Sequence, residues 1–171
     1  MKRLCILVAV LLLSGCGLQP MYAGGGSGAV AQGLAGIEVP PIEGKAGWLI
    51  RNALVDRLGV DRLGQKSGSP RYRLDVRLDD KLEGLGLLSD DTIGRERRTL
   101  RARYQLVDTA NGDILLDATA GSDAGIDIVS SEYATIAAEQ TALENLARVV
   151  ADQIVTKVSM RLRSGGSTPS Q

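Results

Sequence analysis

The segment RYRLDVRLDDKL, residues 71–82, decides the fold, because its apolar and polar residues alternate along almost its whole length. The apolar positions, interrupted only by Asp80, are Tyr72, Leu74, Val76, Leu78 and Leu82. The charged positions between them are Arg71, Arg73, Asp75, Arg77, Asp79 and Lys81. Successive side chains of a strand point to opposite faces, so this pattern predicts a strand with one buried and one solvated face, which is typical of antiparallel sheets.

Two further strands are expected after it. Residues 83–94, EGLGLLSDDTIG, are predicted to form a loop, and a second alternating run follows over about 95–107. The side chains of this run that are expected to face inward are Leu100, Ala102, Tyr104 and Leu106. Residues 108–113, DTANGD, carry the Asn-Gly pair that is typical of a hairpin turn. The chain is therefore predicted to return as a strand over 114–120.

Helical spacing is found on both sides of these strands. From about Gly44 apolar residues recur every three or four positions, and Gly59 or Gly64 is expected to end this first helix. Its apolar residues are Trp48, Leu49, Ile50, Ala53, Leu54 and Leu58. A longer helix is predicted over about 132–163, after a loop at 121–130. Its apolar stripe is Ile136, Leu143, Ala147, Val150, Ile154, Val158 and Leu162, broadened by Leu146, Val149 and Val155.

A short strand at 37–39 precedes the first helix and meets Pro40 and Pro41, which end it or confine it to a sheet edge. The predicted order of elements is therefore β-α-β-β-β-α. This order predicts an α+β fold, a two-layer sandwich in which a mainly antiparallel four-stranded sheet carries two helices on one face.

The amino-terminal stretch has the features of an export signal. Lys2 and Arg3 precede the apolar run Leu4–Leu13, which is followed by small residues and then by Cys16. This run makes about 15 Å of helix at ~1.5 Å per residue, half of a bilayer core, so a transmembrane helix is not expected. The stretch Leu13-Ser14-Gly15-Cys16 is similar to the lipobox of bacterial lipoproteins. That similarity implies cleavage before Cys16 and its acylation; the alternative is a plain secretory signal with an incidental cysteine.

The expected organisation follows from this leader. Residues 1–15 are a signal peptide, 16–36 are the lipidated cysteine and a Gly-rich tether, 37–163 are a single domain, and 164–171 are a disordered tail. The chain has 20 basic and 20 acidic residues, and loss of two basic residues with the leader leaves a net charge of about −2. Such a charge does not suit a general nucleic-acid binder. With Cys5 removed and Cys16 acylated, no thiol remains for a disulfide.

Catalytic chemistry finds little support in the sequence. The chain has no His, so it offers no imidazole for a metal site or for acid–base catalysis. It has no nucleophile elbow, and its glycine clusters do not match phosphate-binding loops. The carboxylate pairs Asp79-Asp80 and Asp90-Asp91 are interpreted as ordinary strand and turn residues. We expect a protein that is not an enzyme and that uses no metal and no cofactor.

A basic face is the feature with the most chemical content. If the strands at 71–82 and 95–107 pair, one solvated face carries six arginines: Arg71, Arg73, Arg77, Arg97, Arg101 and Arg103. Guanidinium groups bind phosphate in bidentate fashion, so this face is a candidate phosphate-binding site. The alternative is a solvated face whose arginines pair across the strands with Asp75 and Asp79.

Several short motifs resemble the lipopolysaccharide-assembly lipoprotein family LptE, in its alphaproteobacterial form. They are the Gly-Cys-Gly-Leu-Gln-Pro-Met-Tyr that ends the leader, Asp91–Arg95, Arg103–Asp108 with Gly112 in the turn, and the Ala-rich Ser131–Glu139. The resemblance runs from the leader to Leu162. It implies a two-layer body that is anchored by lipid in the outer membrane, faces the periplasm and sits as a plug inside the β-barrel LptD.

The resemblance also implies binding of lipopolysaccharide, whose lipid A phosphates suit the six-arginine face. A polar body fits a barrel lumen, which is itself polar. Two other functions stay open: an auxiliary lipoprotein of an ABC-type lipid transport system, and a free-standing lipoprotein that binds a small ligand or peptidoglycan. Co-purification with a large outer-membrane protein, with inner-membrane components or with neither would separate the three.

Overall fold

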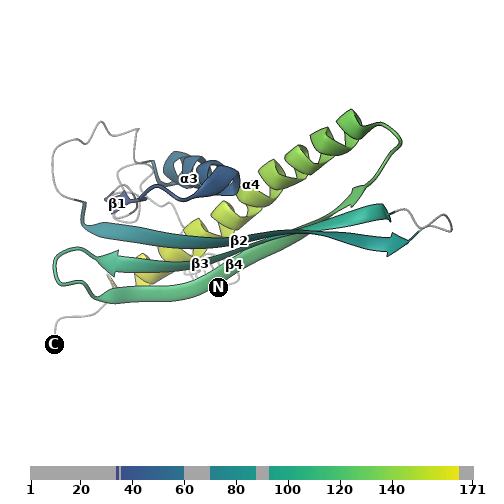
Figure 1. The fold of residues 1–171 in the computed structure, drawn as a ribbon. Helices are drawn as coiled ribbons and strands as arrows, with labels where there is room; N and C mark the ends of the chain where they lie inside the picture. The colour runs from purple at the N-terminus through teal and green to yellow at the C-terminus, as the bar shows by residue number, and fades with distance from the viewer. Residues whose placement is uncertain (1–33, 35, 60–69, 88–92, 166–171) are drawn as a thin grey trace, which may run out of the picture.

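The computed structural model describes residue 34 and residues 36–59, 70–87 and 93–165. Its elements follow the predicted order: β1 (Ile37–Glu38), α3 (Gly44–Leu58), β2 (Tyr72–Leu87), β3 (Ile93–Asp108), β4 (Ile114–Asp127) and α4 (Glu132–Gly165). The strands form one sheet in the order β1-β2-β3-β4. Both helices lie on one side of this sheet, and no described element covers the other side, which we call the open face (Figure 1). The predicted α+β class and its two layers are confirmed.

The sheet is a meander with one added strand. β2, β3 and β4 pair antiparallel in sequence order, and β1 lies parallel to β2. The turn between β3 and β4 is tight, because Gly112 adopts φ +79° and its N–H donates to the Asp108 carbonyl at 2.8 Å. β1 pairs only with Tyr72 and Arg73, so most of the outer edge of β2 lacks a neighbouring strand among the described residues.

The strands are longer than the sequence predicted. β2 continues to Leu87 and β3 begins at Ile93, so most of the loop expected at 83–94 is strand. β4 continues to Asp127, so the loop expected at 121–130 is wrong over most of its length. Isolated glycines and aspartates disfavour strands, but the ladder to a neighbouring strand overrides this preference. Gly121 and Gly125, for example, stand opposite Arg101 and Arg97 of β3.

The helices end and associate as their sequences suggest. Gly59, one of the two predicted helix ends, adopts the left-handed conformation, and its N–H donates to the Val55 carbonyl at 3.1 Å. α4 is a single helix of 34 residues. α3 lies against α4, and an ion pair between Arg57 and Asp152 joins them.

The core fills the space between the helices and the sheet. Leu74 and Leu106 of the sheet and Val150 of α4 have no exposed surface, as predicted. The other core side chains with less than 2% exposure include Tyr104, Ile50, Leu54, Leu100, Leu143, Ile154 and Val158. Leu34 is buried with them, so packing begins within the range that was assigned to the tether. Residues 1–33 and 166–171 lie outside the described residues.

Four residues that were predicted to face inward are exposed instead: Trp48, Leu82, Ile136 and Val149. On α3 the buried face is made by Ala46, Gly47 and Ile50, which turns Trp48 outward. Gly47 sits so close to the preceding chain that a Cβ would lie 2.5 Å from the Ile42 carbonyl oxygen. On α4 the first buried residue is Leu143, because the amino-terminal part of the helix diverges from the sheet (Figure 1).

Candidate functional site

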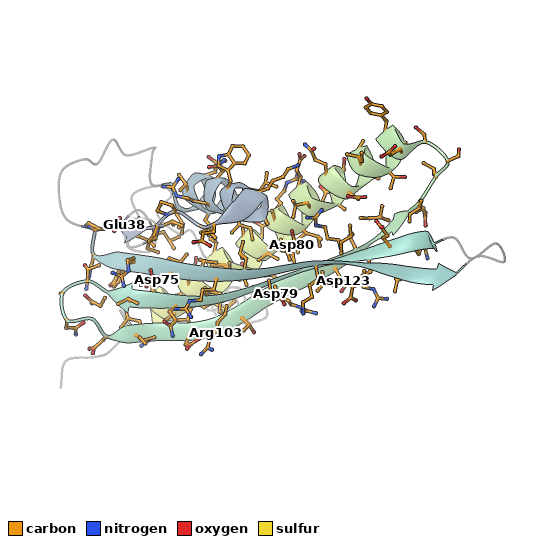
Figure 2. All side chains as sticks on the ribbon, viewed as in Figure 1. Glu38, Asp75, Asp79, Asp80, Arg103 and Asp123 are labelled. Carbon is orange, nitrogen blue, oxygen red and sulfur yellow. The ribbon has the colours of Figure 1, made fainter. Side chains whose placement is uncertain are left out.

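The open face of the sheet brings the predicted arginines together. Arg77 stands directly opposite Arg103 in the β2–β3 ladder, and Arg101 and Arg97 stand opposite Asp79 and Glu83. These positions are odd-numbered, whereas the even-numbered positions of the central strands make the core. Figure 2 shows Asp79 and Arg103 on the side away from the helices and Asp80 on the helix side. The predicted common face is confirmed; its binding role stays a prediction.

β4 adds carboxylates to this face that reasoning from two strands had missed. Asp117, Asp123 and Asp127 stand opposite Gln105, Thr99 and Arg95 of β3. The sequence does carry a signal for them, because these aspartates occupy odd positions that alternate with the even-numbered Ala118, Ala120 and Ala124. Assignment of 121–130 to a loop removed two of the three from the sheet.

Some of the predicted arginines are neutralised within the molecule. Arg73 donates from Nε to Asp75 Oδ1 at 2.9 Å, and this bond raises the pKa of Arg73. Arg103 donates to Asp117 Oδ2 at 3.0 Å, and Gln105 donates to the same oxygen at 2.8 Å. The pKa of Asp117 is lowered by the bond from Arg103 and then by the bond from Gln105. Arg71, just before β2, lies 5.2 Å from the centre of the Tyr72 ring, a cation–π contact.

Three of the six arginines have neither an ion pair nor a ring contact among the described residues. Within the described part of the chain, Arg77, Arg97 and Arg101 take part in no ion pair and no side-chain hydrogen bond. Asp79 is opposite Arg101 but pairs with Lys81 at 3.3 Å. Space for Arg101 comes from Gly121, where a Cβ would lie 2.5 Å from Arg101 Cδ. All three arginines are exposed.

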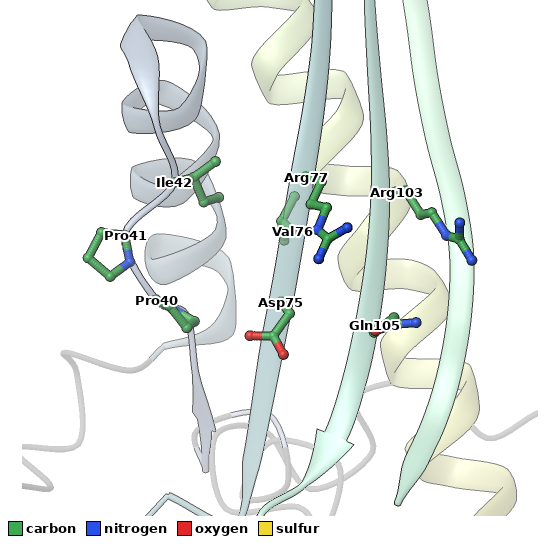
Figure 3. A pocket seen from close by; sticks show the side chains of 8 residues that line it. All are labelled: Pro40, Pro41, Ile42, Asp75, Val76, Arg77, Arg103 and Gln105. Atoms are coloured by element: carbon green, nitrogen blue, oxygen red, sulfur yellow. The ribbon is translucent and has the colours of Figure 1, made fainter. Parts of the chain in front are cut away.

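The spacing of these arginines suits anions. Arg77 and Arg101 are diagonal neighbours across the two strands, so their Cα atoms are roughly 7–8 Å apart and both side chains can reach one phosphate. Arg97 lies about 13 Å from Arg101 along β3, at ~3.3 Å per residue. Arg77 also lines a hollow of about 470 Å³ whose far border is Pro40, Pro41 and Ile42. In Figure 3 the guanidinium groups of Arg77 and Arg103 point away from those prolines.

The described residues offer little other chemistry. No cluster of three or more His, Cys, Asp or Glu residues in the described ranges could hold a metal ion. No helix in the same ranges combines the length and the apolar character needed to cross a bilayer. The predicted lipidation site, Cys16, lies outside the described residues.

The fold is shared with solved lipoprotein structures. A candidate lipoprotein from Caulobacter crescentus CB15 is 24% identical, with a TM-score of 0.62 over 78% of this chain and 96% of its own. The minor lipoprotein of Acinetobacter baumannii is 17% identical, with a TM-score of 0.52 over 72% and 90%. Rare lipoprotein B of Shewanella oneidensis is 10% identical, with a TM-score of 0.52 over 76% and 96%. At such identities the likeness shows the fold alone, and no curated protein sequence matches the chain.

The family is shown by a separate comparison. The family model described as "LptE: Lipopolysaccharide-assembly" matches residues 34–158, which include every strand of the sheet, α3 and most of α4. This chain belongs to the LptE family, and lipopolysaccharide assembly is the process in which that family takes part. The resemblance seen in the sequence is confirmed.

Proposed function

We propose that this protein is an outer-membrane lipoprotein that sits as a plug in an LptD-type β-barrel and helps to assemble it for delivery of lipopolysaccharide to the cell surface. The observation that carries the proposal is the family match over residues 34–158. The open sheet face supports it, because its arginines, aspartates and Thr119 suit the polar interior of a barrel. The helices cover the other face and leave this one available for contact.

The proposed anchor is an acylated Cys16. The supporting observations are the apolar leader that ends in Leu13-Ser14-Gly15-Cys16 and the names of the solved relatives, which are lipoproteins. Two acyl chains already give stable anchoring, since each buried CH₂ contributes about 0.8 kcal/mol. The mature chain then begins at Cys16, eighteen positions before Leu34, the first of the described residues and a buried one.

A pull-down from detergent-solubilised membranes tests both parts of the proposal. The tagged wild-type chain is expected to co-purify with a large outer-membrane barrel, and depletion of that barrel should lower its amount. Cys16→Ala should yield an uncut or soluble periplasmic product. Cys5→Ala is the matched control, because Cys5 lies inside the leader and should not affect anchoring. Co-purification with inner-membrane transport components, or with no membrane protein, would support one of the other two functions.

For the arginine face we propose contact with the phosphates of lipopolysaccharide, chiefly through Arg77, Arg97 and Arg101. These three carry charge that no described carboxylate neutralises, unlike the paired Arg73 and Arg103. Arg71 is intermediate: its side chain contacts the Tyr72 ring, but this cation–π contact does not neutralise its charge. Exposed guanidiniums of this kind should bind phosphate in a salt-dependent way, because the Debye length is only about 8 Å at physiological ionic strength.

The paired and unpaired arginines provide a matched comparison. Arg77→Gln with Arg101→Gln should lower the affinity for purified lipopolysaccharide at least tenfold, since a hydrogen bond to a charged group contributes about 1.5–3 kcal/mol. Arg73→Gln with Arg103→Gln removes the same charge, but from residues already engaged by Asp75 and Asp117, and should cost less. Equal affinities in all three proteins would make this an ordinary solvated face. If the substitutions instead abolished co-purification with the barrel and left lipopolysaccharide affinity unchanged, the face would be a protein interface.

A further inference from the structure

β4 is the last strand of the described sheet, so one side of its backbone has no neighbouring strand among the described residues. The direction of its peptide groups can be read from the ladder. The Ile128 N–H donates to the Gly94 carbonyl at 3.1 Å, so even-numbered residues at this end turn their peptide groups toward β3. The peptide groups of the odd-numbered residues therefore point outward, away from the sheet.

α4 already satisfies part of this edge. The Gly121 N–H donates to Gln153 Oε1 at 3.1 Å, and Gln153 Nε2 donates to the Gly121 carbonyl at 3.3 Å. The side-chain amide thus bonds to Gly121 as the peptide group of an adjacent strand would. Nearer the start of β4, Arg161 Nε donates to the Leu115 carbonyl at 2.7 Å. The carboxyl-terminal half of α4 therefore bonds to this edge at Leu115 and at Gly121.

Beyond Gly121 the edge is unsatisfied. In the described part of the chain, no hydrogen bond is made by the outward N–H and C=O groups of Asp123 and Gly125. A groove of about 690 Å³ lies between this end of β4 and the diverging half of α4. Six of its thirteen lining residues are small: Ser122, Ala124, Gly125, Ala137, Ala138 and Ala142. Small side chains allow another backbone to come close.

The unpaired edge of β2 differs from the β4 edge, because it carries a charged residue on the helix side. Asp80 points to the helix side of that edge and binds Arg98 at 2.9 and 2.7 Å. A charged residue turned inward at an edge is a common device against strand addition. The helix-side residues of β4 over the same stretch are Ser122, Ala124 and Ile126, none of which is charged. Among the described strands, the β4 edge therefore combines open peptide groups with helix-side residues that carry no charge.

We infer that the β4 edge over Asp123–Asp127 accepts an extended segment of a partner polypeptide as a fifth strand of the sheet. A backbone supplies donors and acceptors at the spacing that the open peptide groups require, which an acyl chain cannot do. Its groove-facing side chains must be small or apolar. Those on the open face should be basic, because Asp123 has no ion-pair partner among the described residues and Asp127 holds only the exposed Arg95.

A second copy of this chain fits the edge poorly. Antiparallel pairing of two β4 edges centred on residue 123 sets Asp123 against its own copy, and centring on residue 125 sets it against Asp127. Like charges directly opposite one another destabilise a sheet. The inference goes beyond the proposed function, because it concerns the chemistry of the segment and does not depend on which protein carries it.

The test uses the full chain in detergent and the probe peptide acetyl-Lys-Ala-Lys-Val-Lys-Ala-Lys-amide. Amide hydrogen exchange is followed residue by residue by NMR. Exchange at Asp123 and Gly125 is expected to slow at least about tenfold at saturating peptide, because their N–H groups become hydrogen-bonded. Ala124 and Ile126 should not change, since β3 already protects them. A peptide of equal composition, acetyl-Lys-Lys-Lys-Lys-Ala-Val-Ala-amide, should give no alternating protection.

Two substitutions at Gly125 supply a matched pair. Gly125→Pro removes the outward N–H and places a ring on the edge, where proline is tolerated. Gly125→Ala keeps the N–H, and its Cβ meets no atom within 4 Å. Gly125→Pro should lower the affinity for the probe peptide at least tenfold, whereas Gly125→Ala should bind it as the wild-type chain does. Asp123→Lys, which leaves the backbone intact, should also weaken it and keeps the test decisive if the proline variant does not fold.

Several results would overturn the inference. They are the absence of peptide binding at millimolar concentration, protection that does not alternate along 123–126, and equal binding by folded Gly125→Pro and Gly125→Ala. Protection that rises with protein concentration and without peptide would instead identify a second copy as the occupant. Occupation of the groove by a detergent chain would leave the exchange of Asp123 and Gly125 fast.

Discussion

Ile136 and Leu143 lie seven residues apart on α4, so both fall on nearly the same side of the helix. Leu143 is 1% exposed, whereas Ile136 is 53% exposed. Leu143→Ala should therefore lower the free energy of unfolding by about 2–4 kcal/mol, the usual cost of a cavity in a core. Ile136→Ala should change it by less than about 0.5 kcal/mol. Urea unfolding of both variants measures the difference, and equal losses would place the start of α4 in the core.

Asp117 makes the free energy of unfolding depend on pH in the acid range. Its folded-state pKa is lowered by Arg103 and then by Gln105 from the usual value of 3.8, so it binds protons less readily in the folded than in the unfolded chain. Its stabilisation is therefore complete above about pH 4 and is lost as the pH falls through the lowered pKa. Arg103→Gln should raise that pKa and flatten the acid side of the stability curve. NMR titration of the carboxyl and unfolding at several pH values measure both; an unchanged pKa would contradict the assigned pair.

The arginines show what a sequence pattern can and cannot supply. Alternation with a period of two was enough to place Arg77 and Arg103 on one face, because side-chain direction along a strand follows from local geometry. The two differ in their partners: Arg103 forms an ion pair with Asp117 on a third strand, β4, whereas Arg77 has no ion-pair partner among the described residues. That contact depends on the register between β3 and β4, which a local pattern does not determine.

At the scale of elements, α4 is held unevenly along its length. Its carboxyl-terminal half bonds to β4 through Gln153 and Arg161. Its amino-terminal half is joined to the sheet by Arg98, which binds Asp80 and donates to the Glu139 carbonyl at 3.4 Å. Arg98 thus connects the start of α4 to the sheet by a side-chain hydrogen bond, ahead of the first buried helix residue, Leu143.

Arg98→Gln should loosen that half selectively. The glutamine cannot reproduce the two bonds to Asp80 together with the bond to the helix, so amide exchange over residues 133–142 should rise several-fold, while residues 150–160 stay protected by the core. Arg73→Gln is the control, because it removes a similar two-bond pair on the open face and does not touch α4. Uniform exchange changes along α4, or none, would show that Arg98 does not fasten this half.

The ends of the strands are a second feature that the sequence does not predict. The sequence predicts loops at Gly84 and Gly125, because glycine and aspartate are depleted in strands. Both are held in the sheet by their partners on β3, Glu96 and Arg97. Residue preference describes a segment alone, whereas a ladder adds hydrogen bonds from a neighbour that is distant in sequence. The ends of strands are therefore less predictable than their centres, such as 71–82.

At the scale of the whole molecule, the order of elements and the layer arrangement could be predicted because the two periods, two and 3.6, are strong in this chain. The parallel addition of β1 to β2 could not be predicted, because it involves only Ile37 and Glu38. Nor could the divergence of α4, which depends on how a long straight helix crosses a twisted sheet.

The stability of the body should rest on its apolar core alone. Its described residues bury one continuous cluster of aliphatic side chains and two tyrosines, and the sequence has no cysteine after Cys16. Addition of EDTA or of a reductant should therefore leave the melting temperature unchanged within error. A fall of several degrees with chelator would reveal a structural metal and contradict this account.

The way the chain enters the body has a mechanical consequence. Tension pulling on the residues before Leu34 acts first on Leu34, Ile37 and Val39, which are buried together. The hydrogen bonds that resist it there include those from the Tyr72 N–H to the Gly36 carbonyl and from Arg51 Nε to the Val39 carbonyl. The long β2–β3 and β3–β4 ladders lie outside this line of force. Tension should therefore detach β1 first and add a few residues to the extended chain in front of the domain, while the remaining sheet and its helices stay folded.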